Sequence, residues 1–86
     1  MAEVYTNTDD YGTYYYKDPR LTIRHREDGP AVEWADGDKE WWVNGNRHRL
    51  NGPAVKYTSR YQLWYVDDIF IFAIDKGGKI VNRLGK

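Results

Sequence analysis

Residues Arg24–Trp34 read RHREDGPAVEW, and residues Arg47–Tyr57 read RHRLNGPAVKY, 23 positions further along the chain. The same offset relates WWVNG at 41–45 to WYVDD at 64–68. A fixed period of this size is typical of an array of similar supersecondary units. Such units fold by stacking on their neighbours, and arrays of them commonly act through an extended surface.

Turn signals separate short runs that are rich in aromatic and β-branched residues. Asn44-Gly45 is the strongest hairpin signal of the chain, and Asp67-Asp68 takes its place in the second unit. The sequence therefore predicts an all-β fold, an antiparallel meander of stacked hairpins. The expected strands are 12–16, 21–26, 31–34, 39–43, 46–49, 54–57, 61–66, 69–74 and 79–81.

The 86 residues are expected to form a single domain, 1–86. Because no segment reads as a helix, the sheet is expected to close, to fold over itself or to pair with another copy. Tyr14–Tyr16 is expected to open the chain as a half-repeat. Ile69–Ile74 is apolar at every position, which predicts a central strand or an interface strand. The expected divisions are a loose N-terminus at 1–10, repeat 1 at 21–45, repeat 2 at 46–68 and a C-terminal capping hairpin at 69–83.

Composition narrows the function classes. The chain has no cysteine, hence no disulfide and no thiolate metal site. It has no apolar run long enough for a membrane span and no signal-peptide pattern, so a cytoplasmic location is expected. The formal net charge is zero, but residues 1–45 carry −5 and residues 46–86 carry +5. This asymmetry is compatible with solubility alone, with head-to-tail self-association, or with a partner that is acidic at one end.

The pentapeptide Asn44–His48, with Trp42 three residues before the glycine and a period of 23, resembles the MORN repeat. In that family each repeat is a β-hairpin, and the hairpins stack into an elongated sheet. The resemblance covers roughly residues 21–68. It departs from the usual pattern at 38–40, where Tyr-x-Gly is missing, and at Arg49, where a glycine is expected. The chain is closer to the degenerate MORN-type repeats of bacterial antitoxin-like proteins and small phage or viral proteins, and MORN-type proteins are mostly scaffolds and binding modules.

The repeated Arg-His-Arg triplets are the first candidates for chemistry. Equivalent residues of successive hairpins lie roughly 10 Å apart, too far for His25 and His48 to share a metal ion. The sequence shows no catalytic Ser, Cys or phosphate-loop pattern. We therefore expect no enzyme activity, no metal and no cofactor.

Two interpretations of the triplets stay open. In one, the guanidinium groups stack on Trp and Tyr rings of neighbouring strands, and each His fills a hydrogen-bonding turn position. In the other, they form a basic ladder that binds phosphates or an acidic protein.

The aromatic side chains are the stronger binding candidates. A core-facing set of Trp41, Val43, Trp64 and Val66 would place Trp42 and Tyr65 on the other face, beside Glu40 and Leu63. The family resemblance instead places Trp42 inward, and a sheet that wraps both faces would bury all of these residues.

The predicted function is a non-enzymatic protein-binding module, most concretely a small phage-encoded or antitoxin-like stoichiometric inhibitor of a host protein. One alternative is a nucleic-acid-binding module that uses aromatic stacking and the basic second repeat. The other is a self-assembling structural repeat protein, joined through Ile69–Ile74 or through its charge dipole. The predicted partner-binding residues are Trp42, Tyr65, Arg47, Arg49 and Arg60.

Overall fold

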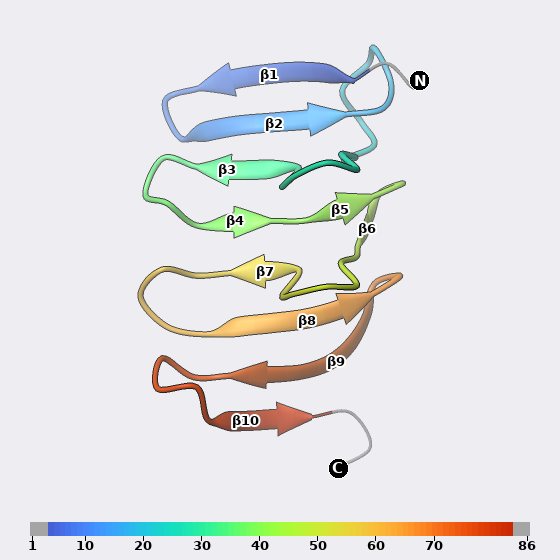
Figure 1. Ribbon diagram of the computed structural model, residues 1–86. Helices are drawn as coiled ribbons and strands as arrows, with labels where there is room; N and C mark the ends of the chain where they lie inside the picture. The colour runs from blue at the N-terminus through green and yellow to red at the C-terminus, as the bar shows by residue number, and fades with distance from the viewer. Residues whose placement is uncertain (1–3, 84–86) are drawn as a thin grey trace.

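The computed structural model describes residues 4–83, which contain ten β-strands and no helix (Figure 1). Eight strands form one antiparallel sheet in the order β1-β2-β3-β4-β7-β8-β9-β10, and β5 (Trp42–Val43) pairs separately with β6 (Asn46–Arg47). The predicted all-β antiparallel meander is therefore confirmed. The strands of the large sheet are β1 (Tyr5–Asp9), β2 (Gly12–Tyr16), β3 (Val32–Trp34), β4 (Lys39–Glu40), β7 (Val55–Lys56), β8 (Gln62–Val66), β9 (Ile69–Ile74) and β10 (Ile80–Arg83).

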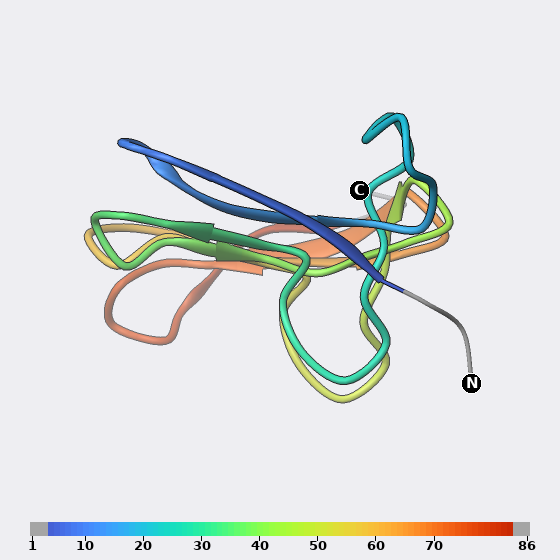
Figure 2. The ribbon, with the colours of Figure 1, turned by 90° about the horizontal axis from the view of Figure 1, so that it is seen from above.

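Within residues 4–83 the sheet is open and is one layer thick. Strand order follows chain order, so β1 and β10 form the two opposite edges (Figure 1). The molecule measures 39 × 26 × 18 Å along its principal axes. The view along the layer shows the loops 24–31 and 47–54 side by side, both projecting from the same face (Figure 2).

The two faces of the sheet differ in chemistry. Residues that lie directly opposite one another on paired strands share a face. We name the two faces by the rows of residues given next. The first row lies on the apolar face. The second row lies on the loop face, from which the two loops project. The row of the apolar face is Tyr14, Val32, Glu40, Val55, Leu63 and Ala73. The corresponding row of the loop face is Thr13, Glu33, Lys39, Lys56, Gln62 and Ile74.

The predicted hairpins at the two-residue turns are confirmed. Asn44 and Gly45 have φ values of 53° and 81° between β5 and β6, and Asp67 and Asp68 have 49° and 66° between β8 and β9. Positive φ at both central residues is the turn whose twist matches that of the flanking strands. Glycine adopts such angles without steric cost, so Gly45 suits its position better than Asp68 does.

The chain departs from the sequence prediction before the first repeat loop. A strand was expected at 21–26, but these residues make only an isolated bridge, between Tyr16 and Arg24. Leu21 has a φ of 60°, and Asp18 accepts hydrogen bonds from the backbone of Thr22 and Ile23, so the segment folds into a local turn. The alternating pattern of 21–26 resembles that of a strand. The position beside β2 is occupied by β3, so this segment has no strand to pair with along its length.

The N-terminal segment also differs from the expectation. Residues 1–10 were expected to be loose, yet Tyr5–Asp9 forms β1 and pairs with β2 over its whole length. Asp9 Oδ1 accepts hydrogen bonds from Tyr11 N at 2.9 Å, Gly12 N at 3.0 Å and Tyr14 Oη at 2.9 Å. One carboxylate therefore closes the turn and orders a strand whose own residues are polar. Residues 1–3 lie outside the described part of the chain.

At the other end, β9 and β10 form the hairpin expected at 69–83, with residue 83 as the last one described. The strand Ile69–Ile74 lies between β8 and β10, second from the edge. Its backbone is paired on both sides, so only its side-chain faces are left for another molecule.

Gly12 lies opposite Trp34 on β3, where a side chain has no room. A Cβ atom at Gly12 would lie 2.6 Å from the backbone oxygen of Glu33, so Gly12→Ala must displace β3 from β2. We expect a loss of about 1–3 kcal/mol in the free energy of unfolding, measured by urea denaturation. Gly77→Ala is the matched control, because its nearest atom is 3.5 Å away, and it should change stability by less than about 0.5 kcal/mol.

The hydrogen bonds from Tyr11, Tyr14 and Gly12 lower the pKa of Asp9 below its ordinary value of 3.8. Because the folded pKa is depressed, the stabilisation is present above the ordinary pKa and is lost as pH falls through the folded value. We expect the stability difference between the native chain and Asp9→Asn to be constant near neutral pH and to shrink below about pH 4. Urea denaturation at a series of pH values measures it, and a difference that grows on acidification contradicts the assignment.

Candidate functional site

Each repeat loop is held to the preceding strand by an arginine on the loop face. The guanidinium carbon of Arg26 lies 4.1 Å from the ring centroid of Tyr15, and that of Arg49 lies 3.8 Å from the centroid of Trp41. Both distances are within the range of cation–π attraction. The predicted stacking of the triplet arginines on Tyr and Trp rings is thus confirmed, and Tyr15 takes the place of Trp41 in the half-repeat. Burial lowers the pKa of the Arg49 guanidinium from its usual value, yet an arginine stays charged at neutral pH.

The same guanidinium groups lie on the Gly-Pro turns of their own loops. Arg49 donates from Nη1 to the carbonyl of Pro53 at 3.1 Å, as Arg26 does to Pro30 at 3.1 Å. A Cβ atom at Gly52 would lie 2.8 Å from the guanidinium carbon of Arg49. The glycine three residues after the arginine therefore leaves room for the guanidinium between the ring and the turn, and a side chain there would displace it.

The histidine of each triplet fixes the next hairpin. His25 is 5% exposed, and its Nδ1 accepts a hydrogen bond from the backbone N–H of Asn44 at 2.9 Å. His48 repeats the contact with the N–H of Asp67 at 3.1 Å, in a more exposed position. The predicted hydrogen-bonding role of the histidines is confirmed, but the histidines lie outside the turns themselves, and each Nδ1 accepts a hydrogen bond from the turn of the next hairpin.

Phenylalanines replace the arginines where the array ends. Phe70 and Phe72 follow Arg47 and Arg49 by the same 23 residues. Phe72 stacks on Trp64 with 4.5 Å between ring centroids, and Phe70 meets Tyr65 edge-on at 5.5 Å. Ring-on-ring packing thus continues the contact that guanidinium groups make in the two earlier units.

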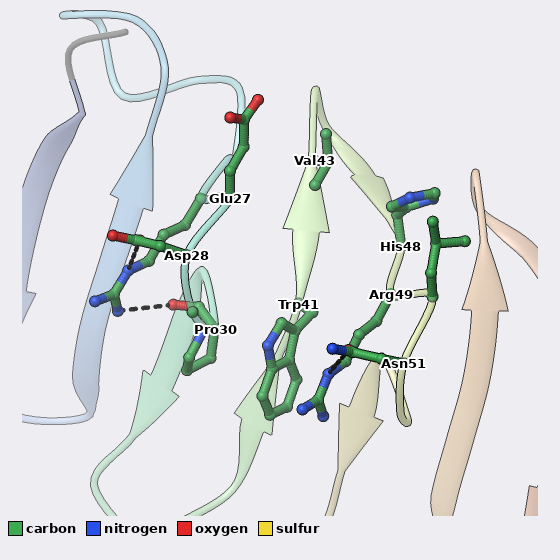
Figure 3. Close-up of a pocket in the computed structure, with 11 residues that line it drawn as sticks. Glu27, Asp28, Pro30, Trp41, Val43, His48, Arg49 and Asn51 are labelled. Carbon is green, nitrogen blue, oxygen red and sulfur yellow. Dashed lines mark hydrogen bonds and ion pairs between the residues drawn. The ribbon is translucent and has the colours of Figure 1, made fainter. Parts of the chain in front are cut away.

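The two repeat loops enclose a groove on the loop face, with a volume of about 730 Å³ (Figure 3). Trp41 and Val43 form its floor. Arg26, Glu27 and Asp28 stand on one wall and Arg49 on the other, so the walls differ in charge. Ion pairs and hydrogen bonds within the loops already engage the arginines nearest this groove.

On the apolar face, arginines and rings alternate along the end of the sheet where β5 and β8 finish. The guanidinium carbon of Arg24 lies 5.3 Å from the centroid of Trp42, and that of Arg47 lies 5.7 Å from Trp42 and 4.3 Å from Tyr65. Arg47 Nε is also 3.1 Å from Asp68 Oδ1. We call Arg24, Trp42, Arg47 and Tyr65 the arginine–ring column.

Glu40 orients the indoles beside this column. Its two carboxylate oxygens accept hydrogen bonds from Trp34 Nε1 at 2.8 Å and Trp42 Nε1 at 2.9 Å. Trp42 therefore lies on the same face as Glu40, as the strand alternation predicted. Both Trp41 and Trp42 are half-buried, so neither the fully buried nor the fully exposed alternative describes them.

The C-terminal part of the apolar face is an open groove of about 530 Å³. Its lining side chains are aliphatic or aromatic, and two of them, Tyr61 and Tyr65, add a phenolic hydroxyl group. Tyr61 is 46% exposed and Val81 is 48% exposed, at its two sides. We call this site the apolar groove; its lining residues are Tyr61, Leu63, Tyr65, Phe70, Ala73 and Val81.

The structure brings together three of the five predicted partner-binding residues, because Trp42, Tyr65 and Arg47 are members of the column. Arg49 lies on the opposite face. Arg60 comes before the start of β8, away from Tyr65, and its guanidinium carbon lies 5.2 Å from the ring centroid of Tyr57. Sequence reasoning missed Phe70 and Val81 as groove residues. The 23-residue offset from Arg47 to Phe70 was a usable signal, whereas nothing local indicated Val81.

Within residues 4–83, no three His, Cys, Asp or Glu side chains gather in a way that could hold a metal ion. The same residues include no helix that is long and apolar enough to cross a membrane. With the fold and the site defined, comparison with known families, curated proteins and solved structures finds no match to the chain. The class is thus set by architecture alone: an all-β antiparallel meander with one large eight-stranded sheet.

His25→Ala should lower the free energy of unfolding by about 2–4 kcal/mol, because it leaves a buried void and an unpaired Asn44 N–H. His48→Ala, the same change in the second unit, should cost about 1–2 kcal/mol because its side chain is more exposed. Thermal and urea unfolding of the two variants measure this order. Equal losses would show that the burial of the histidine does not determine how much this hydrogen bond stabilises the fold.

Proposed function

We propose that the chain is a non-enzymatic protein-binding module whose binding surface is the apolar groove and the adjoining arginine–ring column. The observation that carries the proposal is the exposed C-terminal part of the apolar face, where Tyr61 and Val81 are 46% and 48% exposed, whereas Val32 and Val55 on the same face are buried by their neighbours. A sheet normally buries its apolar face against another layer, and within residues 4–83 no second layer lies on this one.

The composition of this surface supports a protein partner. Aromatic residues and arginine are enriched in protein interfaces, and Tyr65 and Arg47 join the groove to the column. The rings are held in place by neighbours, such as Phe70 against Tyr65, so little side-chain entropy is lost on binding. A phage-encoded or antitoxin-like inhibitor of a host protein remains the expectation given by the resemblance, and the proposal does not depend on it.

Two adjacent residues of β10 provide a matched test. Val81 and Ile80 are each 48% exposed, but only Val81 lines the apolar groove. We expect the tagged chain to retain a protein partner at near-stoichiometric amounts from nuclease-treated lysate of its own cells. Ile80→Lys should retain the same partner, and Val81→Lys should lose it, because a charge is placed in an apolar contact.

Retention by both variants would place the interface elsewhere, and material that disappears on nuclease treatment would favour nucleic-acid binding. Circular dichroism and urea denaturation of both variants provide the control for folding. Purified partner, once identified, allows the affinities of the native chain and the variants to be measured directly by calorimetry.

A second candidate, head-to-tail self-assembly, has one specific observation in its favour. Both edge strands are open, and the β1–β2 and β9–β10 turns lie at the same end of the sheet (Figure 1). The first turn carries Asp9 and Asp10, and the second carries Asp75, Lys76 and Lys79, which leaves it with a net positive charge. Adding a copy in the same orientation would place these charges side by side and would continue the antiparallel order. Recovery of only the chain itself in the capture experiment would support this candidate.

A further inference from the structure

The two repeat units differ at one position in a way that leaves an arginine without its acceptor. Arg24 and Arg47 hold equivalent places. Arg24 forms an isolated β-bridge with Tyr16, and Arg47 is the strand partner of Trp42. The carbonyl of Arg24 accepts the N–H of Gly45 at 2.8 Å, and that of Arg47 accepts the N–H of Asp68 at 2.8 Å.

The side chains at these two turn positions are not equivalent. Asp68 Oδ1 lies 3.1 Å from Arg47 Nε and forms an ion pair with it. Gly45 occupies the same position in the first unit and has no side chain. Within residues 4–83, Arg24 has no side-chain hydrogen bond or ion pair, and its guanidinium contacts the Trp42 ring.

An open groove of about 320 Å³ lies where the missing carboxylate would be. Lys17 adds a second positive charge at the same hairpin tip, where its Nζ donates to Asn44 Oδ1 at 2.6 Å. We call this site the Arg24 groove; its lining residues are Tyr16, Leu21, Thr22, Arg24, Trp42 and Gly45.

We propose that the Arg24 groove binds a carboxylate of a partner protein, an Asp or Glu side chain that takes on Arg24 the place that Asp68 takes on Arg47. The identification of the source as a protein rests on the proposed function. Because Trp42 belongs to both the groove and the arginine–ring column, the site extends the protein-binding surface to the N-terminal half of the sheet.

The chain itself favours a carboxylate over a phosphate. The equivalent arginine already shows the geometry of such a pair, with Asp68 Oδ1 at 3.1 Å from Arg47 Nε. Residues 1–45 carry a net charge of −5, which repels a nucleic-acid backbone more strongly than a single carboxylate.

Gly45→Asp tests the proposal by filling the site from within. A Cβ atom at Gly45 would have Ile23 Cγ2 as its nearest neighbour at 3.5 Å, an ordinary contact. The φ of Gly45 is 81°, near the 66° that Asp68 adopts. The new carboxylate should therefore reach Arg24. Gly45→Asn is the matched control, because it has the same shape and the same backbone cost without the charge.

The probe is acetyl-aspartate amide, titrated into the isotope-labelled full chain and followed by the NMR signals of the Gly45 amide (the residue-45 amide in the variants) and the Trp42 indole. In the native chain and in Gly45→Asn we expect saturable shifts with a Kd of about 1–10 mM, as a single charge-assisted contact allows. In Gly45→Asp and in Arg24→Gln the affinity should fall by at least about tenfold.

Equal affinities in Gly45→Asp and Gly45→Asn, or no saturable shift in the native chain, would overturn the proposal. A second titration with phosphoserine identifies the other source of an anion, and binding of phosphoserine without binding of acetyl-aspartate amide would also overturn it. In the capture experiment, a partner lost with Val81→Lys but retained equally by Gly45→Asp and Gly45→Asn would leave the proposed function standing and remove this site from it.

Discussion

The stacking of an arginine guanidinium between an aromatic ring and a Gly-Pro turn holds each unit to the one before it. Arg49 contacts Trp41, which lies between β4 and β5 of the preceding unit, and the carbonyl of Pro53 in its own loop. A partly buried cation–π contact contributes about 1–2 kcal/mol and a hydrogen bond from a charged group about 1.5–3 kcal/mol. Against a typical total stability of about 5–15 kcal/mol, two such units matter greatly for a single-layer sheet.

The replacement of arginine by phenylalanine explains how the array ends. An arginine at position 72, the place equivalent to Arg49, would need a loop like 47–54 to accept its hydrogen bonds, and β9 is followed by a short hairpin instead. Phe72 keeps the stacking contact with Trp64 and makes no such demand. On the apolar face, Phe70 replaces the arginine equivalent to Arg47 and lines the apolar groove, so the end of the array and the proposed binding surface have one physical origin.

Sequence reasoning predicted the parts of this structure that local chemistry determines. Asn44-Gly45 specified its turn because few other residue pairs accept two positive φ angles. The strand Tyr5–Asp9 was missed because its residues are polar and its order comes from β2 and from the Asp9 carboxylate. The segment 21–26 was wrongly predicted as a strand because the prediction used only its local alternation. Which segment pairs with β2 depends on tertiary packing, and β3 takes that place.

The candidate site was predictable only in part, for a related reason. Strand alternation placed Trp42 with Glu40, but the two indole hydrogen bonds to Glu40 depend on the distance between β3 and β4. The apolar groove depends on a β-bulge in β10 that brings Val81 to the apolar face, and a bulge leaves no periodic signal. The contrast between Gly45 and Asp68 was visible in the sequence, yet its meaning required the ion pair of Arg47.

Each 23-residue unit contributes two strands to the large sheet, β3 and β4 in the first unit and β7 and β8 in the second, so the sheet can grow by whole units. A unit inserted at the junction of residues 45 and 46 would supply its own ring, guanidinium and glycine turn, and would accept those of its neighbours. It would lengthen the sheet by about 10 Å, two strand spacings, and leave the direction of both edge strands unchanged. The distance between the acidic and basic ends therefore grows by the same step with each added repeat, while the residues at each end stay the same.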